Sequence, residues 1–432
     1  AVPGSDARPS FWCFCPRGKN TILRGKHMAY ELEEAKKLVV AAGKKLVESG
    51  LIARTWGNVS ARISDTQFVI TPSGRAYETL TPEEVVVVNI EDCSYEGEIK
   101  PSSEKGVHAA AYRHHPTVDF VIHTHQKAAT IVSITGMEIR NVYKEFQPVL
   151  GNKVPCADYA MSTTNSLRKK VETCIMMNPG CRAIMLMHHG TLCMGDTYEQ
   201  AFEIADALEK CCQRVIKDNY LRHSWAETYS DEGKRNFYLK KNGAVAMPER
   251  ICDLGSSVRN GKTFSLTVGG ETIDVDLETG LGITGIAPKC AKIHKAIYDS
   301  QDCSIIKHVT DPDVIAVSCT GEDMIPMIDD FAQIAGVDVK NRPWIDGDTD
   351  ACAKDIAKAM DSRNAILIQG NGAIITGNSD GDMQALEIIM DKGCEAVIDT
   401  DIFNRPHYVP KVECFLMRTV YLAKYSKEIN KK

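Results

Sequence analysis

The sequence lacks any long hydrophobic run and has little excess of charge of either sign. Its longest strongly apolar stretch, residues 85–88, has the length of a strand, whereas a membrane-spanning helix needs roughly 20 apolar residues. Acidic side chains outnumber basic ones by only 57 to 51, which gives a formal net charge of −6. These absences argue against a membrane protein, a basic nucleic-acid binder and a charged disordered tail.

The sequence also lacks a paired cysteine motif, although it contains 16 cysteines. Cys13 and Cys15 are closely spaced but have no second pair with which to form a zinc site, and Cys211 and Cys212 fall inside a helical pattern. The others are scattered through apolar segments. Disulfide frameworks are typical of small secreted domains. We therefore expect reduced, buried thiols and a cytoplasmic protein.

The length and composition are those of a globular protein with more than one domain. The chain has 432 residues, of which 44% are hydrophobic and 25% charged, and one domain usually takes about 100–200 residues. Residues 1–27 differ from the rest, because they contain three prolines and a basic run without the apolar core of a signal peptide. We interpret them as a leader or tag-like segment outside the fold.

The remaining sequence alternates between helical and strand patterns. Apolar residues recur at helical spacing in residues 31–49, and a longer helix is predicted from residue 196 onward. Short apolar runs predict strands at residues 59–63, 67–71, 85–90, 119–125 and 182–188. This alternation indicates an α/β architecture. After residue 222 the pattern becomes polar and irregular, and we interpret residues 226–250 as a linker.

The pattern then returns in the same order. Five segments of the first half recur after the linker, at an offset of about 180–200 residues, which is longer than any solenoid period. The pairs are residues 67–71 with 262–268, 108–112 with 294–298, 121–123 with 305–308, 183–190 with 365–372 and 201–204 with 385–388. We therefore predict a tandem duplication, with one domain at residues 28–225 and a second copy at residues 251–432.

The strongest chemical motif is a pair of histidines in the first copy. His123 and His125 lie on a predicted strand, where alternate side chains share a face, so both imidazoles can reach one metal ion. A third ligand can come from His188 or His189, and catalytic zinc takes three protein ligands with one open position. An isolated His-x-His is a weak signal, since two ordinary histidines near a surface give the same pattern.

Three loops of the first copy are rich in small hydroxyl and amide groups. They are residues 57–60, 71–74 and 101–104, and each lies between predicted regular elements. Such loops can bind an anion through backbone N–H and hydroxyl donors. The alternative for each loop is ordinary turn chemistry; Ser102 or Ser103, for example, can cap the helix that starts near Glu104.

Taken together, these motifs resemble a known family over residues 29–220. That family is the class II aldolase/adducin family, and the likeness is greatest to its L-fuculose-1-phosphate aldolase branch. The resemblance implies a three-layer α/β/α fold. The motifs that carry it are Gly57-Asn58-Val59-Ser60, Thr71-Pro72-Ser73-Gly74, Pro101-Ser102-Ser103-Glu104, His123-x-His125 and His188-His189-Gly190.

The resemblance implies a role for each matched residue. Glu104 would be the catalytic acid/base, which touches the metal when substrate is absent. The metal, zinc or another divalent ion, would be held by His123, His125 and His189. The residues that would cradle the substrate phosphate are Thr55, Gly57, Asn58, Ser73, Gly74, Ser102 and Ser103.

Two positions depart from the family pattern. In the family, an aromatic hydroxyl from a neighbouring subunit protonates the aldehyde. Tyr143 is our candidate for this catalytic role, although it lies one position from the matched residue, which is Lys144. Ser162 replaces the phenylalanine that lines the aldehyde side, so the choice of aldehyde stays open.

The resemblance implies a lyase of carbohydrate metabolism. Such an enzyme cleaves a ketose 1-phosphate to dihydroxyacetone phosphate and a short aldehyde through a metal-stabilised enediolate. The expected partner is a phosphorylated small sugar, with neither a nucleic acid nor a membrane. Family members form four-fold rings, so we expect a homo-oligomer with active sites near subunit or domain interfaces, in which a dimer of this duplicated chain mimics a tetramer.

The second copy keeps its core pattern but loses the site. Thr310 stands at the position of His125, Asn371 at that of His189 and Cys290 at about that of Glu104, so only His308 persists. The counterpart of residues 57–60 is placed at about residues 255–258. One histidine cannot make a three-ligand site. We therefore expect no catalytic metal in the second copy and a role in packing, assembly or regulation.

Three other functions remain open from the sequence. An L-ribulose-5-phosphate 4-epimerase-like enzyme would use the same metal, but that branch tends to carry aspartate at the position of Glu104. A thioribulose-phosphate dehydratase is another enzymatic alternative. A non-enzymatic, adducin-like scaffold would suit the second copy alone, whereas the intact histidines of the first copy argue against it.

Overall fold

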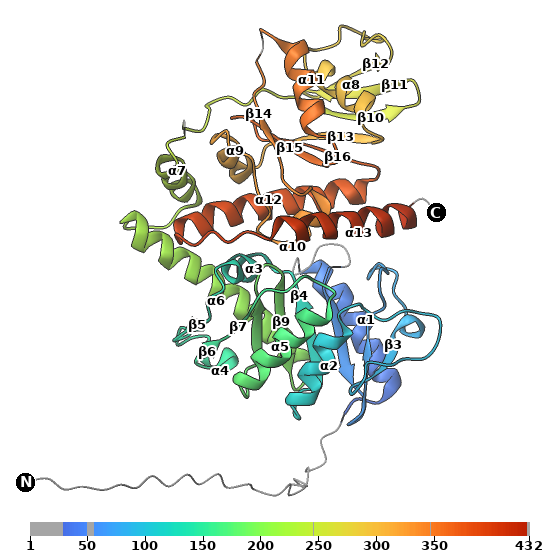
Figure 1. The fold of residues 1–432 in the computed structure, drawn as a ribbon, viewed down its shortest axis with the longest axis vertical. Helices are drawn as coiled ribbons and strands as arrows, with labels where there is room; N and C mark the ends of the chain where they lie inside the picture. Colours follow the sequence, from blue (N-terminus) through green and yellow to red (C-terminus); the bar gives the residue numbers. More distant parts are fainter. Residues whose placement is uncertain (1–28, 50–55, 245, 346, 430–432) are drawn as a thin grey trace, which may run out of the picture.

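The computed structural model describes residues 29–49, 56–244, 246–345 and 347–429. It contains two α/β units of the same design (Figure 1). The first unit, coloured blue to green, extends from α1 to α6, and the second unit, coloured yellow to red, extends from β10 to α13. None of the described helices combines the length and apolar character that a bilayer crossing requires.

The first unit is built on a seven-stranded sheet of order β3-β2-β1-β4-β9-β8-β7. Neighbouring strands are antiparallel except β7 and β8, which are parallel. A separate two-stranded sheet pairs β5 with β6. The strands are β1 (Asn58–Arg62), β2 (Gln67–Ile70), β3 (Val86–Asn89), β4 (Phe120–Thr124), β5 (Ile139–Arg140), β6 (Lys153–Val154), β7 (Cys156–Ala157), β8 (Ala183–Leu186) and β9 (Gly190–Gly195).

Helices cover both faces of this sheet. Side chains of α1, α3 and α6 share one hydrophobic cluster with one face, and those of α2 and α5 share another with the opposite face. The three-layer α/β/α fold is therefore confirmed. The helices are α1 (Leu32–Glu48), η1 (Pro82–Glu84), α2 (Lys105–His114), α3 (Lys127–Ile134), α4 (Gln147–Leu150), α5 (Asn165–Met177) and α6 (Tyr198–Ser224).

Strand β4 carries the histidine motif into the core. Phe120 and Ile122 belong to one hydrophobic cluster and Val121 to the other, because successive side chains of a strand point to opposite faces. By the same alternation His123 shares the face of Val121, which is the face that α2 covers. Glu104 directly precedes α2. The local pattern of β4 thus directs His123 toward the start of α2.

The second unit repeats the first strand for strand, in the order β12-β11-β10-β13-β16-β15-β14. The predicted tandem duplication is therefore confirmed. A buried polar network repeats as well, in which a serine of the sheet contacts a histidine and a tyrosine of the covering helix. The two networks are Ser60 with His108 and Tyr112, and Ser257 with His294 and Tyr298.

The register of the second sheet corrects one expected correspondence. Ser257 pairs with Ile306 as Ser60 pairs with Val121, so residues 57–60 correspond to 254–257, one position earlier than expected. The strands are β10 (Ser256–Asn260), β11 (Thr263–Val268), β12 (Glu271–Asp276), β13 (Ile305–Val309), β14 (Asn341–Arg342), β15 (Ala365–Ile368) and β16 (Ala373–Gly377). The helices are α8 (Ala291–Ser300), α9 (Pro312–Ser318), α10 (Asp329–Ile334), α11 (Thr349–Ala359), α12 (Asp380–Ile402) and α13 (Lys411–Ile429).

Among the described residues, the second unit has no counterpart of α1, and its sequence has adapted to the open sheet face. Val59 and Ile122 are fully buried in the hydrophobic cluster that α1, α3 and α6 form with the sheet. Their counterparts by register are Ser256 and Lys307, which are partly exposed. Polar side chains on this face remain hydrated, so the sheet does not need a covering helix. The duplication therefore kept the sheet and dropped one layer over part of it.

The two units are joined by an extensive packed contact. Helices α12 and α13 lie between the two sheets (Figure 1), and one hydrophobic cluster includes residues of both units. Lys127 of α3 forms ion pairs with Asp391 and Glu395 of α12, at 2.7 and 2.5 Å. Along the chain, the helix α7 (Asp231–Lys241) lies between the two units, inside the segment predicted as a linker. The domain boundaries themselves stay a prediction.

Candidate metal centre

The first unit brings three histidines together at the end of β4 and the turn between β8 and β9. The ligand atoms of His123, His125 and His189 all lie within 4.8 Å of one another, and all three residues are buried. Gly190 makes this approach possible, because a Cβ there would overlap the Thr124 carbonyl oxygen and lie 3.3 Å from Cε1 of His123. The sequence motif His-His-Gly therefore has a steric reason for its glycine.

The Nε2 atoms of these histidines lie close together, and those of His123 and His189 also contact Glu104. Nε2 of His123 lies 3.0 Å from Nε2 of His125 and 3.2 Å from Oε2 of Glu104. Nε2 of His189 lies 2.8 Å from Oε1 of Glu104. The four residues that the resemblance singled out for the metal and its acid/base thus form one compact group.

The opposite ring atoms, the Nδ1 atoms, each face an acceptor oxygen. Nδ1 of His123 lies 2.8 Å from the Thr191 carbonyl oxygen. Nδ1 of His125 lies 2.6 Å from Oδ2 of Asp330, and Nδ1 of His189 lies 3.3 Å from Oδ2 of Asp329. Protons on Nδ1 of His123 and His125 are donated to the Thr191 carbonyl oxygen and to Asp330, whereas Nδ1 of His189 and the Asp329 carboxylate form a close ion pair without a hydrogen bond. Protons on the Nδ1 atoms leave the Nε2 lone pairs directed at a common point.

This arrangement fits a metal ion. Two imidazole nitrogens that both present lone pairs 3.0 Å apart, as His123 and His125 do, repel each other unless a proton or a cation lies between them. Three neutral imidazoles are a preferred donor set of catalytic zinc, which keeps a further position open. The buried cluster therefore has the donor chemistry of a divalent metal centre.

Burial and the neighbouring charges set the pKa values of the metal-free group. Burial lowers the pKa of His125 to about 4. For His189, burial acts in the same direction, but the charges of Glu104 and Asp329 outweigh it and raise the pKa to about 10. Burial alone would raise the pKa of Glu104, but His123 and His189 bring it well below the usual value. Without a metal, Glu104 and His189 therefore form a buried ion pair.

His188 does not belong to this group. It lies in the left-handed region, with φ of 65°, at the turn between β8 and β9. Its Nδ1 lies 2.7 Å from the Met327 carbonyl oxygen of the second unit. The choice between His188 and His189, which strand phase left open, is therefore decided by the turn, which directs only His189 into the cluster.

The loops predicted to bind phosphate lie together beside Glu104. Asn58 donates from Nδ2 to Oε2 of Glu104 at 2.9 Å, and the Ser102 backbone N–H donates to the Thr71 carbonyl oxygen at 3.0 Å. Ser102 also accepts the backbone N–H of Glu104 on its hydroxyl, at 3.2 Å. The remaining members are Gly57, Ser73, Gly74 and Ser103, and Thr55 lies outside the described residues. Phosphate binding by these loops stays a prediction.

Tyr143 lies apart from the histidines of its own chain. Its hydroxyl donates to Oδ2 of Asp218 on α6 at 2.7 Å, and its ring packs under the Arg214 guanidinium. Ser162, which replaces the aldehyde-side phenylalanine, is buried with its hydroxyl 3.7 Å from Sδ of Met417 of the second unit. The catalytic role of Tyr143 stays a prediction.

The second unit contributes residues to this group that no sequence motif indicated. Asp329 and Asp330 face the Nδ1 atoms of His189 and His125, and Lys392 of α12 donates to the His125 carbonyl oxygen at 2.8 Å. These residues are more than 130 positions from the histidines in sequence. Their only local signal is a pair of adjacent aspartates in an otherwise apolar segment.

The second unit has no comparable cluster among its described residues. Cys290 is the N-cap residue of α8, as Glu104 is of α2. Asn371 bonds the Cys252 backbone through both ends of its amide, at 2.7 and 2.9 Å. His308 bonds only main-chain groups among these contacts: its Nε2 donates to the Asn371 carbonyl oxygen at 2.6 Å, and its Nδ1 accepts the Leu254 backbone N–H at 3.2 Å. At two of the metal-site positions, the second unit therefore has side chains that form hydrogen bonds within its own fold.

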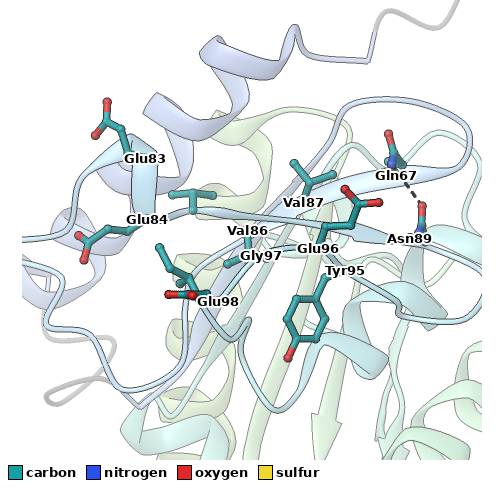
Figure 2. Close-up of a pocket in the computed structure, with 12 residues that line it drawn as sticks. Gln67, Glu83, Glu84, Val86, Val87, Asn89, Tyr95, Glu96, Gly97 and Glu98 are labelled. Atoms are coloured by element: carbon teal, nitrogen blue, oxygen red, sulfur yellow. Dashed lines mark hydrogen bonds between the residues drawn. The ribbon is translucent and has the colours of Figure 1, made fainter.

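A separate hollow of about 480 Å³ lies along the edge strand β3 (Figure 2). Its lining includes Glu83, Glu84, Glu96 and Glu98, which makes it acidic. It contains none of the predicted site residues. Its charge is unsuited to a sugar phosphate, because like charges repel.

Residues 37–216 and 261–398 both match the family described as class II aldolase and adducin N-terminal domain. The chain belongs to the class II aldolase and adducin family. The match covers both units, in agreement with the repeated sheet topology. The family match together with relatives that are named aldolases makes the chain a class II aldolase, which is a carbon–carbon lyase.

Curated relatives match less than half of the chain. A 5-deoxy-D-ribulose 1-phosphate aldolase of Bacillus thuringiensis is 33% identical over 183 residues, which cover 42% of this chain and 84% of the relative. An L-fuculose phosphate aldolase of Escherichia coli is 33% identical over 172 residues, which cover 40% of this chain and 78% of the relative. A solved L-fuculose 1-phosphate aldolase is 30% identical and covers 48% of this chain and 95% of its own, with a TM-score of 0.41.

Proposed function

We propose that this chain cleaves a ketose 1-phosphate, such as L-fuculose 1-phosphate or a related deoxyketose phosphate, to dihydroxyacetone phosphate and a short aldehyde. The observation that carries the proposal is the cluster of three buried imidazoles, two of which, His123 and His189, also contact the Glu104 carboxylate through Nε2. The two relatives at 33% identity, which are named aldolases of sugar phosphates, support the substrate class.

The metal that we propose is zinc, held by Nε2 of His123, His125 and His189. When bound, zinc supplies Lewis-acid stabilisation for the negative charge of the enediolate that carbon–carbon cleavage leaves. The burial of the three rings excludes competing water and strengthens each electrostatic interaction inside the site.

Glu104 is the residue that we propose to move a proton at the carbon beside the breaking bond. Asn58 holds its Oε2 at 2.9 Å, which fixes the direction of the carboxylate. The Asn58 amide is itself oriented, because its Oδ1 faces Nε2 of the buried His108. A carboxylate oriented in this way can exchange a proton with a substrate without a prior change of rotamer.

The neighbouring loops are proposed to bind the phosphate group. The backbone N–H groups of Ser73 and Ser102 already donate to carbonyl oxygens of the neighbouring loops. The donors that we propose are therefore the hydroxyl groups of Ser73, Ser102 and Ser103 and the backbone N–H groups of Gly74 and Ser103. Such donors bind an anion without a formal positive charge. Because the phosphate does not react, its binding energy is available to position the reacting carbons.

An aldol assay tests the proposed function directly. The purified chain, loaded with zinc, is incubated with dihydroxyacetone phosphate and a panel of short aldehydes that includes lactaldehyde and acetaldehyde. We expect aldol product from the wild type and a fall in kcat of roughly 100-fold or more for Glu104→Gln, the usual effect of losing a general acid or base. His189→Ala should lose both zinc and turnover, because only two ligands remain.

His308→Ala is the matched control, because His308 occupies the position of His123 in the unit without a metal cluster. It should retain the wild-type rate. The site assignment is wrong if neither Glu104→Gln nor His189→Ala lowers turnover. Interconversion of pentulose 5-phosphates without any cleavage would instead favour the epimerase.

A further inference from the structure

A segment of the second unit lies directly on the metal-binding turn of the first. The Met327 carbonyl oxygen lies 2.7 Å from Nδ1 of His188, and the backbone N–H of Asp329 donates to the His188 carbonyl oxygen at 2.9 Å. These two hydrogen bonds hold residues 327–329 against the turn that contains His188. They place the side chains of Asp329 and Asp330 behind the imidazoles of His189 and His125.

Both aspartates are buried against an imidazole Nδ1 atom. The Oδ2 atom of Asp330 lies 2.6 Å from Nδ1 of His125, and that of Asp329 lies 3.3 Å from Nδ1 of His189. Their side chains are only 4% and 0% exposed. Buried carboxylates are costly unless they are paired. Among the described residues Asp329 forms no other ion pair, so His189 is the cation that balances its negative charge.

The same unit also holds the backbone of one ligand. Lys392 of α12 is buried and donates from Nζ to the His125 carbonyl oxygen at 2.8 Å. His123, in contrast, is oriented entirely within the first unit, by the Thr191 carbonyl oxygen. Two of the three histidines therefore depend on the second unit for their orientation, and one does not.

A carboxylate on the outer nitrogen of a metal-binding histidine has a defined effect. It keeps the proton on Nδ1, fixes the ring and makes Nε2 a stronger donor to the metal. Loss of such a partner typically lowers metal affinity by about 10- to 100-fold. Asp330 has this geometry, because its Oδ2 is hydrogen-bonded to Nδ1 of His125. Asp329 lies 3.3 Å from Nδ1 of His189 as an ion pair without a hydrogen bond, and a small shift of either side chain would form one.

We propose that Asp329 and Asp330 are positioning residues of the metal centre, so that the degenerate second unit completes the metal site of the first. This inference rests on the proposed function only in that the three histidines bind zinc. It gives the second unit a chemical task that its own lost ligands do not reveal. The metal site is therefore shared between the two copies of one chain.

The test measures zinc affinity rather than turnover. Asp329→Asn and Asp330→Asn keep the size and one acceptor oxygen of each side chain but remove the charge. We expect each variant of the full chain to bind zinc about 10- to 100-fold more weakly than the wild type in competition with a chromophoric chelator. Because the Asp330 contact is the shorter one, Asp330→Asn should have the larger effect.

Glu413→Gln is the matched control. Glu413 is another carboxylate of the second unit at the same interface, where its Oε2 accepts the Tyr159 hydroxyl at 2.6 Å without touching a histidine of the cluster. It should leave zinc affinity within about twofold of the wild type. Equal losses in all three variants would assign the effect to docking of the units and overturn the proposal. Wild-type affinity in folded Asp329→Asn and Asp330→Asn would overturn it as well.

A second measurement does not depend on the stability of any variant. In the zinc-loaded wild type labelled with ¹⁵N-histidine, NMR should show His125 and His189 with slowly exchanging protons on Nδ1. Rapid exchange of both protons, as for rings open to water, would contradict the proposal. A wild type that binds zinc but cleaves no ketose phosphate would contradict the proposed function alone.

Discussion

At the residue scale, the most informative feature is a histidine that recurs in both units without binding a metal. His108 and His294 each lie at the fourth position of their helix, and each contacts a serine hydroxyl through Nδ1, at 2.6 and 2.7 Å. Burial lowers the pKa of His108 to about 3 and that of His294 to about 4. Both rings are therefore neutral members of the fold.

The neutral His294 predicts a specific loss of stability in acid. Above pH 6.5 the ring is neutral in both the folded and the unfolded chain. Between pH 6.5 and about 4, the unfolded chain takes up a proton that the folded chain does not. The free energy of unfolding therefore decreases as the pH is lowered through this window. His294→Gln removes this proton, and its stability should fall less over that window, by up to about 3 kcal/mol.

Urea unfolding of both proteins at pH 7 and pH 4.5 measures this difference. His294 is suited to the test because it lies outside the metal cluster and bonds the Leu254 carbonyl oxygen, at 2.7 Å, within its own unit. The stability difference between wild type and variant should shrink on acidification. Parallel losses in the two proteins would show that His294 titrates normally in the fold.

At the element scale, α7 is the element that the sequence described least well. Its polar composition indicated a linker, yet the structure forms a helix there that packs against α9 and α12. Ser230 caps the helix by accepting the Gly233 backbone N–H at 3.0 Å. Its Lys234 is buried, with Nζ 3.0 Å from both Oε1 of Glu395 and Oδ1 of Asp399. Most polar residues of α7 are exposed or partly exposed, but Lys234 is buried in ion pairs, and composition cannot distinguish such a helix from a solvated loop.

Lys234→Met tests how much this helix stabilises the docked arrangement. Removing the ammonium leaves the Asp399 carboxylate buried without its cation, and breaking one side of a buried pair usually costs about 3–5 kcal/mol. We expect a loss of that size in the free energy of unfolding, measured in urea. Lys210→Met is the control, because Lys210 and Asp206 form an exposed pair, with 59% and 60% of their side chains accessible. That variant should change stability by less than about 1 kcal/mol.

At the scale of the whole molecule, the duplication produced two sheets with one metal cluster. The two units share the sheet topology and the serine–histidine–tyrosine network. They also share a tightly packed glycine at or directly before the start of the strand that follows the site turn. A Cβ on Gly372 would overlap the Val309 carbonyl oxygen, as a Cβ on Gly190 would overlap that of Thr124. The second unit thus kept the constraints that its fold requires. Among its described residues it lacks counterparts of α1 and of the metal cluster of the first unit.

This asymmetry predicts one zinc per chain. Metal analysis of the purified wild type by mass spectrometry should give a stoichiometry close to one, because the second unit offers only His308 at the ligand positions. His123→Ala should remove nearly all the zinc, whereas His308→Ala should remove none. Two zinc ions per chain, or a loss of zinc in His308→Ala, would contradict a metal-free second unit.

The sequence alone determined the family, the α/β class and the duplication, and it indicated His123, His125 and either His188 or His189 for the cluster, because these depend on local patterns and on their repetition along the chain. The alternation that places His123 and His125 on one face of a strand, and the glycine that follows His189, can both be recognised from neighbouring residues in the sequence. Thr55 lies outside the described residues, and the predicted roles of the phosphate loops and of Tyr143 remain to be tested.

Only the tertiary structure decided what the second unit does at the first. Asp329, Asp330 and Lys392 reach the histidines across a docked interface, and no periodicity or motif connects residues so far apart in the chain. The structure also decided between His188 and His189, because a left-handed turn residue directs the two rings apart. Local sequence specifies which side chains are available, whereas packing of the two units determines which of them face one another.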